Sequence, residues 1–153
     1  MNGRNNQQAA AAYDTALRLL ARREHSRREL HTKLQLRGYE RQHIAQALDR
    51  LCEQNHLSDR RFAEAYVDER VAKGFGALRI DAELRERGID GELIDAALMP
   101  FAEQWDTLLA DLLQSKFGGE PPADRRQWLK RARFLQTRGF RADSIKRLLG
   151  DYE

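Results

Sequence analysis

The chain has 153 residues, of which 41% are hydrophobic, 33% are charged and 8% are aromatic, and its formal net charge is +3. It contains no apolar run of about 18 residues, which a membrane-spanning helix needs, and no secretory signal, so we expect a cytoplasmic protein. The one cysteine, Cys52, excludes an internal disulfide, and we expect it to be buried on a helix. The four histidines lack the spacing of metal ligands, so we expect no metal and no other cofactor.

The first third of the chain predicts three helices. Residues 1–8 are polar and are expected to be a disordered leader. From 9 to 23 the apolar residues recur every three or four positions, which is typical of an amphipathic helix. Ser26 and Glu29 form a capping box that begins a second helix, which ends at Gly38, and a third helix follows.

The middle third predicts three more helices. Ser58 or Asp59 can cap a first helix, which ends at Gly74. A second helix runs to Gly88, and Asp90 is placed to cap the third. No segment of the chain alternates apolar and polar residues for long enough to predict a strand.

The last third predicts another such triplet with a longer internal loop. Its first helix runs from about 102 to 116, and a loop with two glycines and two prolines follows at 118–122. The second helix then runs to Gly139, and the third contains Ile145.

An arginine and a glycine followed by an apolar residue occur three times, with the glycines 50 and 51 residues apart. The copies are Arg37-Gly38-Tyr39, Arg87-Gly88-Ile89 and Arg138-Gly139-Phe140. A leucine stands four residues before each glycine and an isoleucine six residues after it. The sequence therefore predicts an all-α protein of three tandem three-helix repeats, at 9–56, 57–101 and 102–153, that form an elongated, curved array.

Each of these glycines predicts the end of a helix. A left-handed residue commonly ends a helix, and glycine adopts that conformation without steric penalty. The apolar residue after it then contacts the leucine of the last turn. The preceding arginine complements the helix dipole, so capping alone can explain its presence.

Charge is unevenly distributed along the chain. Residues 1–57 hold ten basic and six acidic side chains, 58–101 hold seven and ten, and 102–153 hold ten and eight. Between 125 and 147 nine basic residues are opposed by Asp143 alone. The two ends therefore favour a polyanion or an acidic protein surface as partner.

Basic residues cluster at helical spacing in both ends of the chain. A solvated helix face can explain any one of them, but the clusters together favour contact with nucleic acid or nucleoprotein, mostly through phosphates and with little sequence specificity. The predicted contact residues are Arg18, Arg22, Arg23, Arg27 and Arg28 in the first third and Arg126, Lys130, Arg131, Arg133 and Arg138 in the last.

Motifs of catalysis are absent from the sequence. It has no phosphate-binding glycine loop, no His-Glu-x-x-His and no Gly-x-Ser-x-Gly. We therefore expect a binding protein with no small-molecule substrate, and not an enzyme.

The middle third resembles the RecX family. The resemblance lies in Leu57-Ser58-Asp59-Arg60-Arg61-Phe62-Ala63-Glu64-Ala65-Tyr66-Val67 and in the stretch from Gly76 to Ile89, and it extends over roughly 12–152. The family pattern falls on Asp59, Arg61, Arg79, Glu83 and Gly88, and on apolar residues that we expect in the core. The third repeat lacks a comparable polar signature.

The resemblance implies a bacterial regulator of the RecA recombinase. Such a protein binds in the groove of the RecA filament on single-stranded DNA and limits strand exchange and LexA coprotease activity, so the implied partners are the filament and, through it or directly, single-stranded DNA. Two alternatives remain open. Three-helix units also suit a helix-turn-helix protein that binds duplex DNA, and a third possibility is an adaptor that binds protein only.

Overall fold

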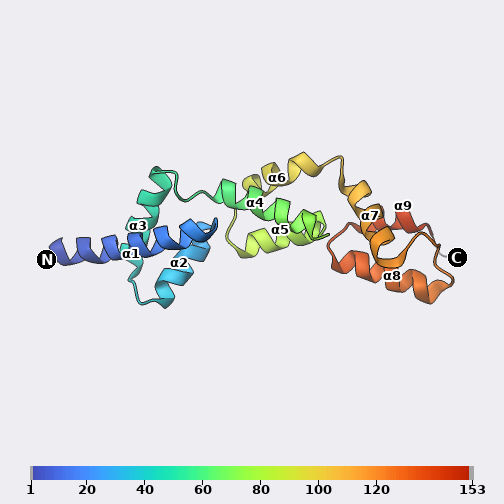
Figure 1. Ribbon diagram of the computed structural model, residues 1–153, viewed down its shortest axis with the longest axis horizontal. Coiled ribbons are helices and arrows are strands. Elements are labelled where there is room, and N and C mark those ends of the chain that lie inside the picture. Colours follow the sequence, from blue (N-terminus) through green and yellow to red (C-terminus); the bar gives the residue numbers. More distant parts are fainter. Residues whose placement is uncertain (1, 152–153) are drawn as a thin grey trace. The chain divides into compact units, whose positions relative to one another are not determined.

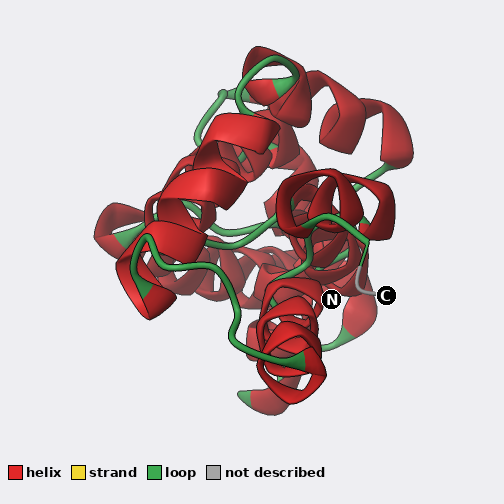
Figure 2. Ribbon diagram, turned by 90° about the vertical axis from the view of Figure 1, so that its right-hand side faces the viewer, coloured by secondary structure: helices red, strands yellow, loops and turns green. Residues whose placement is uncertain are grey.

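The computed structural model describes residues 2–151, and within them the chain is all-helical, with no strand (Figures 1 and 2). These residues form nine α-helices and one short 3₁₀ helix. None of the helices there is long and apolar enough to cross a membrane. The helices are α1 (Asn2–Arg22), α2 (Arg27–Leu36), α3 (Arg41–Glu53), α4 (Asp59–Ala72), α5 (Ala77–Glu86), α6 (Gly91–Leu98), α7 (Trp105–Phe117), α8 (Arg125–Thr137) and α9 (Ala142–Leu149), with the 3₁₀ helix at Met99–Phe101.

The nine helices confirm the predicted all-α class of three three-helix repeats, which we call the first (α1–α3), second (α4–α6) and third (α7–α9) repeat. By its internal contacts the chain divides into two compact units. The N-terminal unit consists of two segments, the chain up to Ala65 and Arg85–Leu93. The C-terminal unit also consists of two segments, Tyr66–Leu84 and the chain from Ile94 onward. The second repeat is thus shared between the units. The predicted repeat boundaries and the curvature of the array stay predictions.

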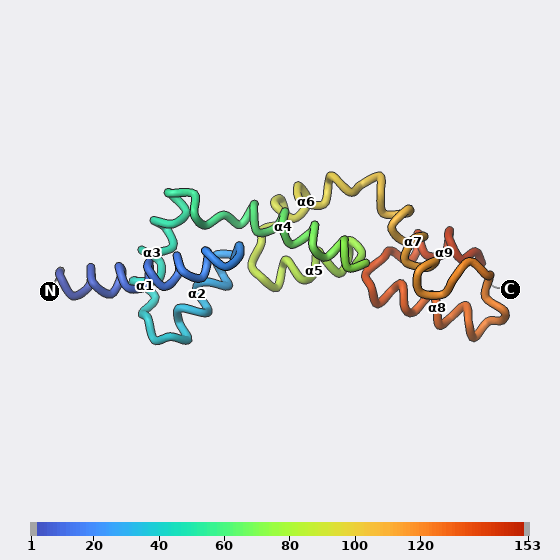
Figure 3. Tube along the Cα trace, in the orientation of Figure 1, coloured from blue at the N-terminus to red at the C-terminus, as the bar shows by residue number. Residues whose placement is uncertain are grey.

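The N-terminal unit has its core among α1, α2 and α3, which pack against one another (Figure 3). The spacing of leucine and isoleucine around Gly38 places them on the inner faces of α2 and α3, because positions three and four apart share a helix face. The buried cluster consists of Ala16, Leu19, Leu30, Leu34, Ile44, Leu48, Leu51 and Leu57. Burial of this apolar area stabilises α2 and α3, which are short enough to be marginal alone.

Helix α1 is longer than predicted. It begins at Asn2, so residues 2–8, which the sequence analysis assigns to a disordered leader, are helical in the structure. The alanines that follow are strong helix formers, and a helix once nucleated extends at little cost into neighbouring glutamine and arginine. Ala9 and Ala12 are buried, whereas residues 3–8 are exposed.

The helix ends follow the predicted chemistry. The Ser26 hydroxyl accepts from the backbone N–H of Glu29 at 3.1 Å, and the Glu29 carboxylate accepts from that of Ser26 at 3.1 Å, which completes the capping box of α2. Gly38 has a φ of 94°, and the N–H of Tyr39 donates to the carbonyl of Leu34 at 3.2 Å, as in a Schellman ending. Gly139, with a φ of 98°, ends α8 in the same way.

The C-terminal unit has its core among α7, α8 and α9. Leu109, Leu135, Phe140 and Ile145 form its buried centre. The Trp105 ring meets the ring of Phe140 edge-on at 6.5 Å between centroids, a favourable aromatic geometry. The third repeat therefore has a packed core of its own below the basic surface of α8.

Successive repeats are joined by a repeated hydrogen bond. Ser26 and Gly76 both stand twelve residues before the glycine that ends their own repeat's middle helix. In the N-terminal unit the Ser26 hydroxyl donates to the carbonyl of Arg87 at 2.8 Å, and in the C-terminal unit the N–H of Gly76 donates to the carbonyl of Arg138 at 2.8 Å. The residue before the middle helix of one repeat thus donates a hydrogen bond to the residue that follows the middle helix of the next repeat.

Cys52 is exposed, so the prediction that it is buried is wrong. It follows Leu51, which fills the inner face of α3, and its own position is rotated about 100° away from that face. Its Sγ lies 3.6 Å from Nη1 of Arg27.

His25 is a buried titratable group beside the start of α2. Its ring is 2% exposed, with Nδ1 3.1 Å from the carbonyl oxygen of Arg23 and Nε2 2.9 Å from Nζ of Lys33. A neutral ring with its hydrogen on Nδ1 donates to the carbonyl and accepts from the ammonium. Burial, together with the charges of Arg23 and Lys33, lowers the pKa of His25 below its ordinary value of 6.5, against the opposite effects of the Arg23 carbonyl and Glu29.

We expect His25 to make the protein less stable in mild acid. The unfolded chain takes up a proton near pH 6.5, whereas the folded chain binds it only at lower pH. The contribution of His25 to the free energy of unfolding is therefore complete above 6.5 and is lost as the pH falls through the lowered pKa of the folded state. Urea unfolding between about pH 7.5 and 5 measures this, with His25→Asn as control, because that variant lacks the His25 ring and keeps the rest of the chain. An equal decline in both proteins would contradict the assignment.

Candidate functional site

The exposed face of α8 carries four basic side chains close together. Asp124 caps this helix by accepting from the N–H of Gln127 at 2.9 Å, and the spacing then places the basic side chains along one face. Together with Leu129 they line an open groove of about 560 Å³. We call the following residues the α8 basic face: Arg125, Arg126, Lys130 and Arg133.

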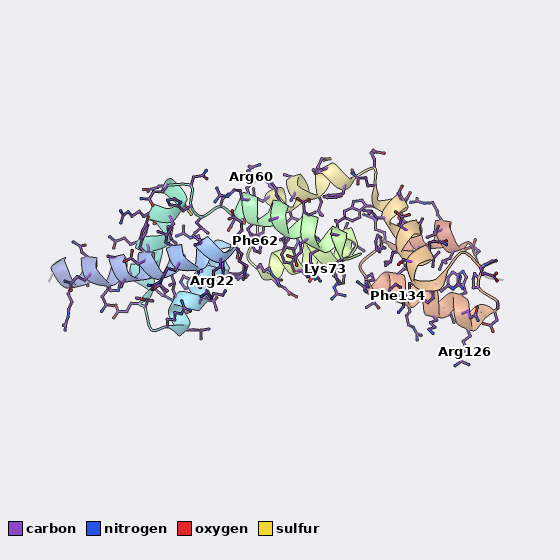
Figure 4. The ribbon with its side chains drawn as sticks, viewed as in Figure 1. Arg22, Arg60, Phe62, Lys73, Arg126 and Phe134 are labelled. Carbon is purple, nitrogen blue, oxygen red and sulfur yellow. The ribbon has the colours of Figure 1, made fainter. Side chains whose placement is uncertain are left out.

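The α8 basic face has no acidic counterpart. Within the part of the chain that the structure describes, none of its four side chains takes part in an ion pair, and all four are exposed. Arg126 extends away from the helix into solvent (Figure 4). Four uncompensated cations at a groove attract a polyanion, because each phosphate contact releases condensed counter-ions.

Arg131 does not belong to this face, although it is one of the predicted contact residues. It is 9% exposed, its Nη1 donates to the carbonyl of Glu120 at 2.8 Å, and its guanidinium lies 5.3 Å from the centre of the Phe117 ring. It stands four residues before Leu135 and therefore shares the inner face of α8. Arg131 holds the long loop before α8, and its predicted role in phosphate binding stays a prediction.

Arg138 is likewise engaged within the protein. Its Nη1 donates to the carbonyl of Lys73 at 3.1 Å, and its guanidinium lies 4.6 Å from the centre of the Phe75 ring and 5.3 Å from that of Phe134. Figure 4 labels Lys73 and Phe134. Arg138 joins the second and third repeats inside the C-terminal unit, and its predicted role in phosphate binding stays a prediction.

Two of the predicted arginines of the first repeat are paired. Arg23 lies 3.0 Å from the carboxylate of Glu29, and Arg27 lies 2.6 Å from that of Asp49. Burial opposes the charge of Arg27, but its hydrogen bonds to Asp49 and Cys52 outweigh that effect and raise its pKa. These pairs leave Arg23 and Arg27 less available to an external anion.

The other three predicted arginines of this repeat are exposed and form no ion pair among residues 2–151. Arg18 donates to the hydroxyl of Thr15 at 3.3 Å, and Arg22 lies at the end of α1 (Figure 4). The stem of Arg28 passes over Gly88, where an added Cβ would come within 2.8 Å of it. Arg18 and Arg22 are thus the free cations of the N-terminal unit's predicted cluster.

In the N-terminal unit, the residues of the resemblance pattern join the first repeat to the second. The Asp59 carboxylate accepts from the backbone N–H of Arg27 at 2.8 Å. Arg61 lies 3.0 Å from the carboxylate of Glu24 and donates to the carbonyl of Asn55 at 2.8 Å. These residues build joints between repeats.

In the C-terminal unit, Arg79 joins the second repeat to the third, whereas the hydrogen bonds that Glu83 accepts from Arg70 and Tyr66 lie within the second repeat. Arg79 donates to the carbonyl of Thr137 at 3.2 Å and lies 4.3 Å from the centre of the Phe75 ring. The Glu83 carboxylate accepts from Arg70 at 3.0 and 2.9 Å and from the Tyr66 hydroxyl at 3.2 Å. A half-buried bidentate pair of this kind orients both side chains.

Sequence reasoning missed two members of the α8 groove. Neither Arg125 nor Leu129 is among the predicted contact residues, and Leu129 is 42% exposed in the structure. The spacing of Leu129 from Arg125 and Arg133, four residues on each side, places all three on one face and could have shown this. Among residues 2–151, no group of three acidic, histidine or cysteine side chains could hold a metal ion.

Family models match all three repeats. The first three-helix domain of RecX matches 12–51, the second matches 58–98 and the third matches 102–149. The chain is also 45% identical over 136 residues to the regulatory protein RecX of Halorhodospira halophila, which covers 89% of this chain and 84% of that protein. It is 47% identical over 135 residues to that of Pseudomonas fluorescens strain Pf-5, covering 88% and 87%.

Solved structures agree with the fold. A crystal structure of a regulatory protein RecX superposes with a TM-score of 0.81 at 25% identity and covers 97% of this chain and 74% of that one. The fold of RecX from Lactobacillus salivarius superposes with a TM-score of 0.74 and covers 94% and 97%. The chain belongs to the RecX family of regulatory proteins.

Proposed function

We propose that this protein is a negative regulator of the RecA recombinase that acts in the cytoplasm by binding and without catalysis. It binds in the groove of the RecA filament on single-stranded DNA and limits strand exchange, ATP hydrolysis and LexA coprotease activity. Membership of a family of regulatory proteins supports the regulatory part of this proposal. The observation that carries the filament part is the exposed, unpaired α8 basic face.

The chemistry of that face fits a nucleoprotein filament. Its cations can neutralise phosphates or acidic side chains without reading base sequence, as a regulator of a filament formed on any strand requires. The face is charged and exposed, so binding through it depends strongly on salt. Leu129, which is exposed and lines the groove, can add an apolar contact.

The proposal is tested by titrating the protein into RecA on single-stranded DNA, below one molecule per RecA. RecA's ATPase rate and LexA cleavage are measured together. We expect both to fall at these low ratios, because a protein in the filament groove affects more than one RecA subunit. Unchanged rates for both reactions, with filaments formed normally, would refute the proposal.

The duplex-binding alternative finds less support in the structure. In a helix-turn-helix protein the last helix enters the major groove and is rich in basic or amide side chains. Here α6 carries Glu92 and Asp95 on its exposed surface and has no basic residue. Protection of a specific duplex site by this protein alone would favour the alternative.

A further inference from the structure

The three arginines of the repeated tripeptide have different surroundings. The backbone of Arg87 accepts the joint hydrogen bond from Ser26, and Arg138 is held by the carbonyl of Lys73 and by two aromatic rings. Arg37 belongs to the first repeat. Its guanidinium is exposed and makes no hydrogen bond or ion pair among residues 2–151.

Arg37 is also free of the steric contact that accompanies each joint. A Cβ added at Gly88 would meet Arg28 at 2.8 Å, and one added at Gly139 would meet Arg79 at 2.3 Å. A Cβ at Gly38 would meet no atom within 4 Å. The first copy of the tripeptide therefore presents to solvent the surface that the other copies use for joints.

Arg37 lines the same pocket as Arg18 and Arg22, the two arginines of α1 that form no ion pair among residues 2–151. Arg18 and Arg22 share one face of α1, and together with Arg37 they line an open pocket of about 300 Å³. The other lining residues are Thr15 and Leu19, so among the described residues no carboxylate lines this pocket. Arg18 keeps one hydrogen bond, to the hydroxyl of Thr15 at 3.3 Å.

We propose that Arg18, Arg22 and Arg37 form a phosphate-binding pocket that takes a phosphodiester of a single-stranded nucleic acid directly, without another protein. The three guanidinium charges around the pocket repel one another. A bound oxyanion lies close to all three, and its attraction to them outweighs that repulsion. Guanidinium groups offer paired N–H donors that match the oxygens of a phosphate. The pocket is open on one side, as passage of a continuous strand requires. This inference adds a direct DNA contact to the proposed function and can hold independently of it.

The test measures binding of fluorescein-labelled oligo(dT) to the protein alone, by anisotropy, at several salt concentrations. We expect Arg37→Gln to weaken binding about threefold to tenfold and to reduce the slope of log affinity against log salt by about 0.7, the value for one contact to a single strand. Arg22→Gln should give the same result. Arg41→Gln is the matched control, because Arg41 is exposed at the start of α3, outside the pocket.

Competition with inorganic pyrophosphate distinguishes a strand from a free phosphate. We expect millimolar pyrophosphate to displace little oligonucleotide, which supports a backbone site. Pyrophosphate binding that Arg37→Gln abolishes, with oligonucleotide binding unchanged, would overturn the strand assignment. Oligonucleotide and pyrophosphate binding that are both unchanged in Arg37→Gln and Arg22→Gln would overturn the pocket itself. A wild-type protein that binds oligo(dT) through Arg37 but does not inhibit RecA would refute the proposed function and leave this site standing.

Discussion

Replacing Arg126 and Lys130 together by glutamate should weaken inhibition of RecA by about tenfold or more at physiological salt. Both side chains belong to the α8 basic face and have no internal partner in the described part of the chain. Each phosphate contact to a single strand releases about 0.7 of a counter-ion, so the loss of two contacts near 0.15 M salt corresponds to roughly tenfold in affinity. Repulsion by the new carboxylates adds to that loss.

The same double variant should fold as well as the wild type. Arg126 lies in the first turn of α8, where a negative charge is favoured by the helix dipole. Arg126 and Lys130 are like charges four residues apart, and two glutamates keep a repulsion of similar size. We therefore expect the free energy of unfolding to change by less than about 0.5 kcal/mol, which urea unfolding followed by circular dichroism measures.

A charge-matched variant separates position from net charge. Arg4→Glu with Arg41→Glu changes the net charge by the same amount, and both residues are exposed and lie outside the α8 basic face. We expect this control to inhibit RecA's ATPase within about twofold of wild type, because neither residue is part of the α8 basic face. Equal inhibition by wild type and by the Arg126→Glu and Lys130→Glu double variant would refute the role of the α8 basic face.

The sequence predicted the local structure of the repeats well because that structure depends on near neighbours. The Ser26 capping box and the glycine endings at Gly38 and Gly139 rest on residues within six positions of each other. Leu34, Leu84 and Leu135, each four residues before its glycine, are fully buried. Three tandem three-helix repeats therefore followed from pattern alone.

The basic clusters were predicted less well because availability depends on contacts distant in sequence. Arg131 and Arg133 are both arginines in the same basic cluster, yet the Arg131 side chain is buried and bonds the loop at Glu120. Arg138 meets a carbonyl 65 residues away. The helical spacing from Leu135 gave a signal for Arg131, whereas nothing local indicated that Arg138 would pack between Phe75 and Phe134.

Gly139→Ala should destabilise the third repeat far more than Gly38→Ala destabilises the first. Both glycines end a helix with nearly the same positive φ, 98° and 94°, so each alanine bears a similar left-handed penalty of about 1–2 kcal/mol. At Gly139 the new Cβ would also lie 2.3 Å from Cβ of Arg79 and 2.6 Å from its backbone nitrogen. Relief of that overlap moves backbone in the joint and adds about 1–3 kcal/mol.

The joint at Gly139 is held by two backbone hydrogen bonds that the same movement disturbs. The carbonyl of Gly139 accepts from the N–H of Leu78 at 2.9 Å, and that of Arg138 accepts from Gly76 at 2.8 Å. A Cβ at Gly76 would itself lie 2.6 Å from the Gly139 backbone, so the two backbones are in close contact. Movement of either backbone would therefore weaken these hydrogen bonds. The two substitutions thus differ only in whether a second repeat is packed against the glycine.

Tryptophan fluorescence can follow the third repeat alone, because the chain's two tryptophans, Trp105 and Trp128, both lie in it. In urea unfolding we expect Gly139→Ala to shift the fluorescence midpoint strongly to lower urea, by the equivalent of about 2–5 kcal/mol. Gly38→Ala should lower the circular dichroism midpoint modestly and move the fluorescence midpoint less, since repeats of a tandem array interact mainly with their neighbours. Equal shifts for the two variants would show that the glycine at the joint matters for its φ alone and that the contact with Arg79 adds nothing to stability.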